Sequence, residues 1–225
     1  MSVIKYSDDK RVIFREEDHS YTLDGNKRLT SITQYISKFK APFDKDRISK
    51  QYAKKHGRTQ DDVLEEWKKK ADDACTMGTY IHSLFEDFID GKELTDINDV
   101  DYPKSKVAIE VINDLFISGR LIPVATELIV YTDEYAGQID CIAKDKDGKH
   151  YIIDWKTNKE IKRSNHWQSM NGKFGVFDDC NFNHYSIQLR AYQSMCKQFD
   201  ISDCYICHIN ETGYELIRAR DIEPF

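Results

Sequence analysis

The chain has 225 residues and a formal net charge of −6; 40% of its residues are hydrophobic and 32% are charged. This balance is typical of one folded domain and excludes a disordered or fibrous chain. The charge argues against indiscriminate coating of DNA or anionic membranes, but it is compatible with a local basic groove.

No targeting or membrane segment stands out. No apolar run approaches the ~18 residues of a membrane span, and the start "MSVIKYSDDKRVIF" lacks the layout of a signal peptide. We therefore expect a cytoplasmic protein, in the host cytoplasm if the chain is viral, that is neither secreted nor bound to a membrane.

The first half of the sequence predicts a β-hairpin followed by helices. Two β-favouring runs flank the turn signal formed by Asp24 and Gly25. Helical patterns follow over residues 44–56, from the cap-like "TQDD", and over "GTYIHSLFEDFID", which Gly91 ends. Pro103 fits the first turn of a further helix.

Strand patterns then take over. "PVATELIVYTD", "YAGQIDCIAKD" and "KHYIIDWKT" each predict a strand, and a turn signal at 146–149 joins the last two. An irregular stretch at 160–181 precedes an amphipathic helix, "HYSIQLRAYQSMCKQF", and "DCYICHI" and "YELIRAR" predict two more strands. The order of elements predicts a single α/β (or α+β) domain over 1–225, with a mixed central sheet flanked by helices.

Acidic residues on two neighbouring strands carry the clearest chemical signal. Asp154 and Lys156 end the third strand and, being two residues apart, point to the same face. Asp140 lies on the preceding strand of the same predicted hairpin. Two carboxylates that meet there repel each other unless a cation lies between them, and oxygen ligands with one imidazole suit Mg²⁺ or Mn²⁺. The alternative is a modest salt bridge beside turn-forming acids.

Other polar side chains interrupt apolar faces. His82 and Glu86 are one helical turn apart, as are Gln188 and Tyr192, and Glu127 interrupts "PVATELIV". Each alone is more often solvated or satisfied within the protein. Together with the strand carboxylates they favour metal-dependent hydrolysis of a phosphodiester, in which a lysine orients the nucleophile or stabilises developing charge.

Four motifs in this order, "GTYIHSLFE", "AGQID", "IDWKT" and "QLRAY", resemble those of the PD-(D/E)XK nuclease superfamily, and most closely its RecB-like branch. They cover residues 78–192, about half of the chain. The resemblance implies a restriction-endonuclease-like catalytic core over 76–225, with an N-terminal hairpin and helical extension over 1–75.

The resemblance also implies roles for individual residues. It gives the metal these ligands: His82, Asp140, Asp154, the backbone carbonyl of Trp155, and in accessory positions Glu86 and Glu127. Lys156 matches the catalytic lysine, acting with Asp140 and Asp154. Gln188 and Tyr192 match a motif that contacts DNA and supports the site. The third motif carries Asp where many relatives carry Glu, a change that the superfamily tolerates.

Two basic segments suggest contact with nucleic acid. Residues 38–58 hold eight Lys or Arg against two Asp. They form either a solvated helix face or a patch that follows a nucleic-acid backbone through Lys50, Lys54 and Lys55. Beyond the third strand, basic and aromatic side chains alternate in a way that suits single-stranded nucleic acid: Lys159, Lys162, Arg163 and Trp167. We also expect bases to stack on three aromatic rings: Trp155, Trp167 and Tyr192.

The six cysteines have no framework spacing, which predicts reduced thiols. Cys204 and Cys207 form a CxxC motif, which in this branch invites comparison with iron–sulfur nucleases. Because both lie on one predicted strand three residues apart, their side chains point to opposite faces. We therefore expect no iron–sulfur cluster.

These features predict an Mg²⁺-dependent deoxyribonuclease, for which Mn²⁺ would substitute. The expected activity is that of an exonuclease on single-stranded DNA in replication, recombination or repair, with a helicase or single-strand-binding protein as candidate partner. Two alternatives stay open: a structure-specific endonuclease that cuts flaps or junctions, and a non-catalytic DNA-binding subunit of a recombination complex. The second is disfavoured because a degenerate nuclease typically loses the core Asp or Lys, and both are present here.

Overall fold

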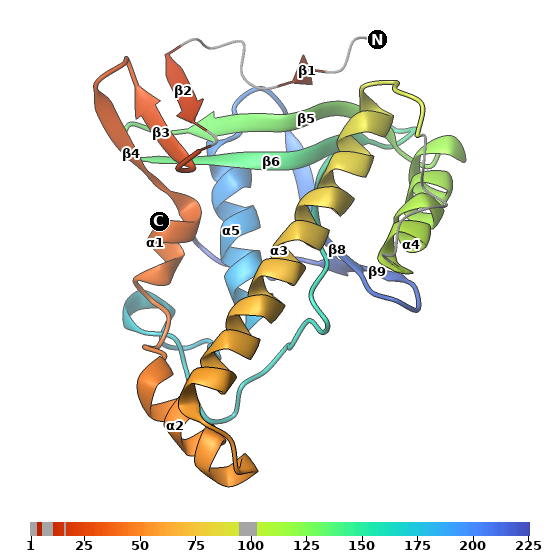
Figure 1. Cartoon of the computed structure of the whole chain (residues 1–225). Helices are drawn as coiled ribbons and strands as arrows, with labels where there is room; N and C mark the ends of the chain where they lie inside the picture. The colour runs from red at the N-terminus through yellow and green to blue at the C-terminus, as the bar shows by residue number, and fades with distance from the viewer. Residues whose placement is uncertain (1–3, 6–10, 16, 95–102) are drawn as a thin grey trace.

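The structure, a computed structural model, describes residues 4–5, 11–15, 17–94 and 103–225. These residues form a mixed β-sheet with helices on both of its faces (Figure 1). The expected α/β architecture with a mixed central sheet is therefore confirmed. Among the described helices, none combines the length and the apolar character that a membrane span requires.

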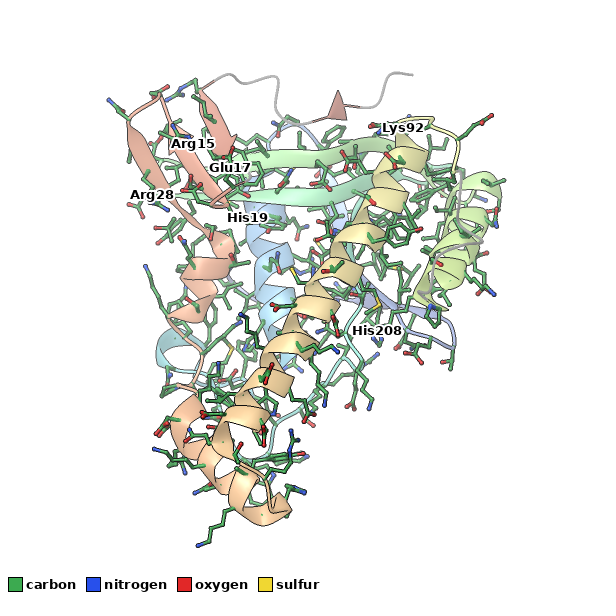
Figure 2. The ribbon with its side chains drawn as sticks, in the orientation of Figure 1. Arg15, Glu17, His19, Arg28, Lys92 and His208 are labelled. Carbon is green, nitrogen blue, oxygen red and sulfur yellow. The ribbon has the colours of Figure 1, made fainter. Side chains whose placement is uncertain are left out.

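The N-terminal strands extend the central sheet. They are β1 (Ile4–Lys5), β2 (Val12–Arg15), β3 (Ser20–Leu23) and β4 (Lys27–Ser31). Asp24 and Gly25 join β3 to β4 with φ angles of 51° and 75°, as a tight hairpin turn requires. β4 then pairs in parallel with β6, and β1 with β5. Figure 2 shows Arg15 and Arg28 on these N-terminal strands.

Four helices follow these strands in the described part of the chain. They are α1 (Ile32–Ser37), α2 (Lys45–His56), α3 (Gln60–Ile89) and α4 (Pro103–Ile112), which continues as a π-helix (Asn113–Ile117). α2 packs along the N-terminal half of α3, beyond the edge of the sheet (Figure 1). It begins after Asp44 and ends at Gly57, whose φ is 63°, so its predicted bounds are confirmed.

α3 differs from the prediction. The sequence analysis expects two helices, whereas the structure has one continuous helix of 30 residues that starts after the capping residue Thr59. Gly78 lies inside it, because a single glycine weakens a helix by only about 1 kcal/mol and does not end it. The boundary set at residue 75 between the extension and the core therefore falls within α3.

The second half of the chain builds the centre of the sheet. Its elements are β5 (Ile122–Tyr131), β6 (Tyr135–Lys144), β7 (His150–Lys156), a short 3₁₀ helix (Gly172–Phe174), α5 (Asn181–Met195), β8 (Ile201–Ile209) and β9 (Tyr214–Arg218). The three predicted strands of the meander are confirmed. α5 starts three residues before its predicted start and ends earlier, because Cys196 takes an extended backbone.

The sheet forks at β6. Along one edge, β6 pairs with β5 over nearly its whole length. On the other edge, it pairs with β4 at residues 135–136 and with β7 at residues 141–144. In the described structure, no strand pairs with residues 137–140 on that edge. β4 ends at Ser31, where α1 begins, and beyond Ile153 β7 pairs with β8, which leaves an opening in the sheet at Gly137 and Gln138.

Apolar side chains form a core on each face of the sheet. Ile152 and Cys204 belong to the core beneath α1 and α5, whereas Ile153, Trp155 and Cys207 belong to the core beneath α3 and α4. This alternation places Asp154 and Lys156 on the α5 side of β7, as expected for residues that share a strand face. The opposite orientation of the two CxxC thiols is confirmed.

The opening at the fork is closed on the α5 side by one ring. A Cβ atom added at Gly137 would overlap the ring of Tyr192, which is only 5% exposed. The glycine of "AGQID" is therefore required by close packing between β6 and α5.

We predict that Gly137→Ala lowers the free energy of unfolding by about 1–3 kcal/mol, because the methyl group displaces a buried ring. The matched control is Gly78→Ala, whose methyl group would lie 3.6 Å from Thr157 Oγ1. This control should be neutral, or stabilising by up to about 1 kcal/mol, since it lies within a helix. Urea denaturation measures both. If Tyr192→Leu does not offset the loss in a double mutant, the overlap with the ring is not its cause.

Candidate active site

The side chains of β5 and β6 depart from regular alternation at the same position. Ala125 lies opposite Ile142, and Leu128 lies opposite Ile139, and all four belong to the core on the α5 side. In regular strands, residues three apart face opposite sides of the sheet. Glu127, between the two pairs, has a φ of 49°, a value that residues other than glycine rarely adopt. β5 and β6 are therefore both irregular at this point.

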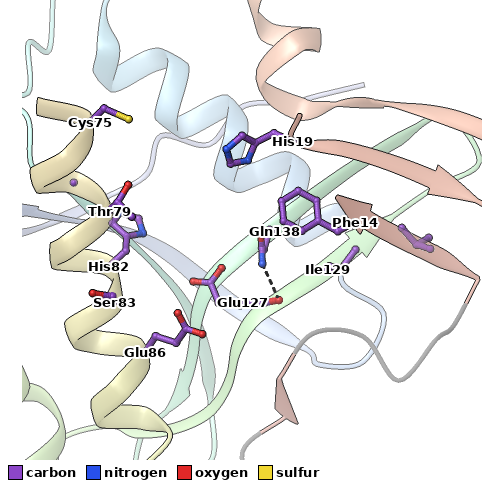
Figure 3. Close-up of a pocket in the computed structure, with 12 residues that line it drawn as sticks. Phe14, His19, Cys75, Thr79, His82, Ser83, Glu86, Glu127, Ile129 and Gln138 are labelled. Atoms are coloured by element: carbon purple, nitrogen blue, oxygen red, sulfur yellow. Dashed lines mark hydrogen bonds between the residues drawn. The ribbon is translucent and has the colours of Figure 1, made fainter. Parts of the chain in front are cut away.

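The irregularity brings two carboxylates to α3. Glu127 and Asp140 lie opposite each other, between the paired positions on either side. One carboxylate oxygen of each and one ring nitrogen of His82 all lie within 4.8 Å of one another. Figure 3 shows Glu127 and His82 facing the same cavity. The unusual φ costs on the order of 1–3 kcal/mol, and strain of this kind is concentrated at functional sites.

The peptide of Trp155 holds His82 and Asp140 in place. Its N–H donates to Asp140 Oδ2 at 2.9 Å, and its carbonyl oxygen lies 3.0 Å from His82 Nε2. Since a carbonyl only accepts, His82 Nε2 carries a proton. In the neutral ring, the lone pair of Nδ1 then faces Asp140 Oδ2 at 3.5 Å.

A cation between these groups would stabilise the arrangement. Two acceptors at that distance, with Glu127 close by, repel each other. A protonated His82 would supply only one charge against two carboxylates. Histidines that bind metals usually donate their second N–H to a carbonyl or carboxylate, as His82 does here. Two carboxylates and one imidazole form a donor set suited to Mg²⁺ or Mn²⁺, so these residues fit such an ion.

The indole of Trp155 anchors this peptide. The ring is 2% exposed, lies stacked on Phe85 at 3.9 Å between centroids, and meets Phe116 edge to face at 6.3 Å. A buried ring has no free face for a base. The expectation that bases stack on Trp155 is therefore wrong, and burial rules out the same role for Tyr192.

Asp154 and Lys156 form a buried ion pair on the α5 side of β7. Asp154 Oδ2 lies 2.5 Å from Lys156 Nζ, and the two side chains are 3% and 17% exposed. Burial raises the pKa of Asp154 to about 6, against the attraction of Lys156. Burial also opposes the charge of Lys156, but the attraction of Asp154 and Asp140 outweighs it and raises the lysine pKa.

The ion pair adjoins the metal-ligand group without joining it. Lys156 Nζ lies 3.4 Å from the Trp155 carbonyl oxygen that also contacts His82, and the charges of Asp140 and His82 both act on the pKa of Asp154. The closest group therefore contains Glu127, which the resemblance places in an accessory position, and not Asp154. Metal binding by Asp154 and by the Trp155 carbonyl stays a prediction.

A cavity of about 850 Å³ lies in front of this group (Figure 3). α3 forms one side with His82, Glu86 and neighbouring residues, and the strands contribute Glu127 and Gln138. A second cavity of about 240 Å³ lies at the fork, against Tyr192. Its position makes the region around β6 accessible from two sides.

α5 contributes Tyr185, which no sequence motif indicated, beside the predicted Gln188 and Tyr192. Gln188 Nε2 donates to the hydroxyl of Tyr192 at 2.8 Å, and burial raises the pKa of that tyrosine well above its usual value. One turn earlier, the ring of Tyr185 lies 5.0 Å from Lys156 Nζ, a distance at which a cation attracts an aromatic face. The helical spacing of Tyr185, Gln188 and Tyr192 was the signal that could have found it.

The predicted nucleic-acid contacts lie away from the cavity. Lys159 and Lys162 are exposed, Trp167 is 96% exposed, and Arg163 pairs with Glu215 at 2.6 Å. On α2, Lys54 and Lys55 are exposed, while Lys50 pairs with Asp46 at 2.7 Å. From its first residue, α3 rises about 33 Å to reach His82, so α2 could contact only a distant part of a bound strand.

Comparison with known proteins identifies no relative: no protein-family model matches the chain, and no curated protein sequence matches it significantly. The function is therefore inferred from the geometry of the site.

We predict that Glu127→Gln and Asp140→Asn each weaken Mn²⁺ binding about tenfold or more, because each removes a charged ligand. Glu86→Gln is the matched comparison: the resemblance makes Glu86 an accessory ligand, but it lines the same cavity from outside the group, so its loss should weaken binding less. Calorimetric titration of the folded variants measures the effect. Equal losses for Glu86→Gln and Glu127→Gln would point to general charge rather than to ligation.

Proposed function

We propose that this chain is a metal-dependent deoxyribonuclease of the PD-(D/E)XK superfamily, RecB-like branch, that degrades single-stranded DNA from a free end. One observation carries the proposal: the lone pair of His82 Nδ1 converges with the carboxylates of Glu127 and Asp140, next to the buried pair of Asp154 and Lys156. An acidic group of this kind beside a buried lysine suits phosphodiester hydrolysis.

Each residue of the site has a distinct part in this proposal. His82, Glu127 and Asp140 would hold the divalent ion, with Asp154 beside them as the resemblance implies. When bound there, the ion supplies positive charge for the phosphate and lowers the pKa of water. Lys156, whose raised pKa keeps it charged at neutral pH, orients the nucleophile or stabilises charge on the phosphate. The Trp155 peptide keeps His82 and Asp140 in register with Lys156.

Features outside the cavity support a nucleic-acid substrate. Trp167 offers an almost fully exposed ring close in sequence to the exposed Lys159 and Lys162, and exposed bases of single strands stack on such rings. Lys54 and Lys55, on α2, would add contacts to phosphates that depend on salt but not on sequence. A helicase or single-strand-binding protein remains the proposed class of partner, because a duplex must be opened first.

The direct test is incubation of end-labelled single-stranded and double-stranded DNA with Mg²⁺, with Mn²⁺, or with EDTA. The proposal expects loss of the single strand with either ion and none with EDTA. An RNA strand of the same sequence in parallel tests the preference for DNA. No cleavage under any condition, together with measurable binding, would favour a non-catalytic DNA-binding subunit.

We predict that Lys156→Ala reduces cleavage by about 10²- to 10³-fold or more, because it removes charge at the reacting phosphate, while Mn²⁺ affinity is retained. Asp140→Ala and Asp154→Ala should also abolish cleavage. Lys146→Ala is the matched control, since that lysine is exposed in the turn between β6 and β7, and it should cleave at nearly the wild-type rate.

Folding must be checked for the lysine variant. Lys156→Ala leaves the buried Asp154 without its ion-pair partner, which lowers stability. Thermal unfolding is therefore measured in parallel, and Lys156→Gln serves as a second variant that keeps a polar group. A folded Lys156 variant that cleaves at the wild-type rate would contradict the assigned role.

We also predict that a covalently closed single-stranded circle survives in Mg²⁺ while its linear form is degraded, because the strand must enter from an end. Blunt duplex should be a poor substrate, since opening it costs on the order of 1.4 kcal/mol per base step. Gel electrophoresis of the circle and the linear strand measures both. Rapid loss of the circle would instead favour the structure-specific endonuclease.

A further inference from the structure

His19 lies where the two cavities meet. It lines both the cavity in front of the candidate metal ligands and the smaller one at the fork, and it shares this position with Gln138. It belongs to the turn that joins β2 to β3, far from α3 in the sequence. Figure 3 shows its ring across the cavity from His82 and Thr79 on α3. No motif in the sequence analysis pointed to this residue.

The backbone of His19 is held in an unusual conformation. Its φ is 46°, in the left-handed region that glycine adopts freely and that asparagine, aspartate and histidine adopt more often than other residues. A glycine would make this turn without strain. The chain nevertheless has an imidazole there, and its side chain is exposed to the cavity.

Phe14 lies beside this histidine and lines the same cavity. The two rings are 5.9 Å apart at an interplanar angle of 48°, and Phe14 is partly buried against the core under the N-terminal strands. Its neighbour Ile13 is 50% exposed and points to the other face of β2, because successive strand residues alternate. The hairpin of β2 and β3 thus presents one aromatic face and one imidazole to the cavity.

The two sides of the cavity differ in chemistry. The α3 side and the strand floor carry His82, Glu86 and Glu127, which suit a cation, whereas the hairpin side carries no carboxylate among the residues that line this cavity. A bound strand needs donors for its phosphates and apolar faces for its bases, and the hairpin side offers an imidazole and an aromatic ring.

We propose that Phe14 and His19 form the strand-binding wall of the site. Phe14 stacks on an unpaired base, and His19 donates a hydrogen bond to the phosphate of a nucleotide next to the scissile one. The inference rests on the proposed nuclease function and extends it to the substrate class: a base paired within a duplex has no free face for Phe14, so this wall selects single strands.

The experiment compares matched variants by fluorescence anisotropy on a labelled single-stranded oligonucleotide, with Ca²⁺ replacing Mg²⁺ to prevent cleavage. Phe14→Leu and His19→Gly should each raise the dissociation constant about tenfold. Ile13→Leu places the same leucine side chain on the opposite face of β2 and should have no effect. An oligonucleotide with abasic sites should bind the Phe14→Leu variant and the wild type equally, because it has no base to stack.

Two His19 variants separate the side chain from the turn. His19→Gly adopts the observed φ without strain and should not lower the melting temperature, and His19→Asn keeps both the backbone preference and a donor and should bind better than His19→Gly. In Mg²⁺, both should raise KM more than they lower kcat, and Mn²⁺ affinity should be unchanged.

The outcomes distinguish this inference from the proposed function. If the wild type cleaves DNA, and His19→Gly and Phe14→Leu bind and cleave like it, the proposed role of the wall is wrong. The proposed nuclease function is then retained. If the wild type cleaves nothing, the nuclease is wrong, and the anisotropy measurements alone decide whether the hairpin binds single strands. Equal weakening for the normal and abasic oligonucleotides would overturn the stacking role of Phe14.

Discussion

The backbone N–H and carbonyl of Trp155 are the constraint on which the candidate site depends. The N–H binds Asp140 and the carbonyl oxygen accepts from His82, so one backbone unit orients an acid from β6 and an imidazole from α3. The indole, buried between Phe85 and Phe116, fixes that unit in the core. Because the N–H and the carbonyl both flank the Cα atom that carries the indole, movement of the indole would shift both partners together.

The sheet supplies the rest by departing from regularity. In an unbroken pair of strands, Glu127 and Asp140 would face α5, away from His82. Both strands are irregular here, Glu127 with an unusual φ, and both carboxylates lie beside His82 on α3. The cores on the two faces of the sheet hold the strands on either side in register, which offsets the local strain. Where neither β4 nor β7 pairs with β6, Gly137 and Gln138 line the smaller cavity.

Short-range periodicity made part of this site predictable. The two-residue repeat of a strand put Asp154 beside Lys156 and separated Cys204 from Cys207, and the structure confirms both. The turn at Asp24 and Gly25 was predictable because these residues favour the backbone angles of a hairpin turn. The same reasoning divided α3 in two, because Gly78 resembles a boundary when the packing around it is unknown.

The sequence by itself determined most of the elements, their order and the residue types of the site, because these depend on backbone preferences between near neighbours. Only the tertiary structure decided that Glu127 joins His82 and Asp140, that the rings of Trp155 and Tyr192 are buried, and that a hairpin residue, His19, faces α3. These features arise from strand register, a local irregularity and contacts between segments far apart in the chain. No periodicity in the sequence predicts these features, since each depends on where two distant segments meet.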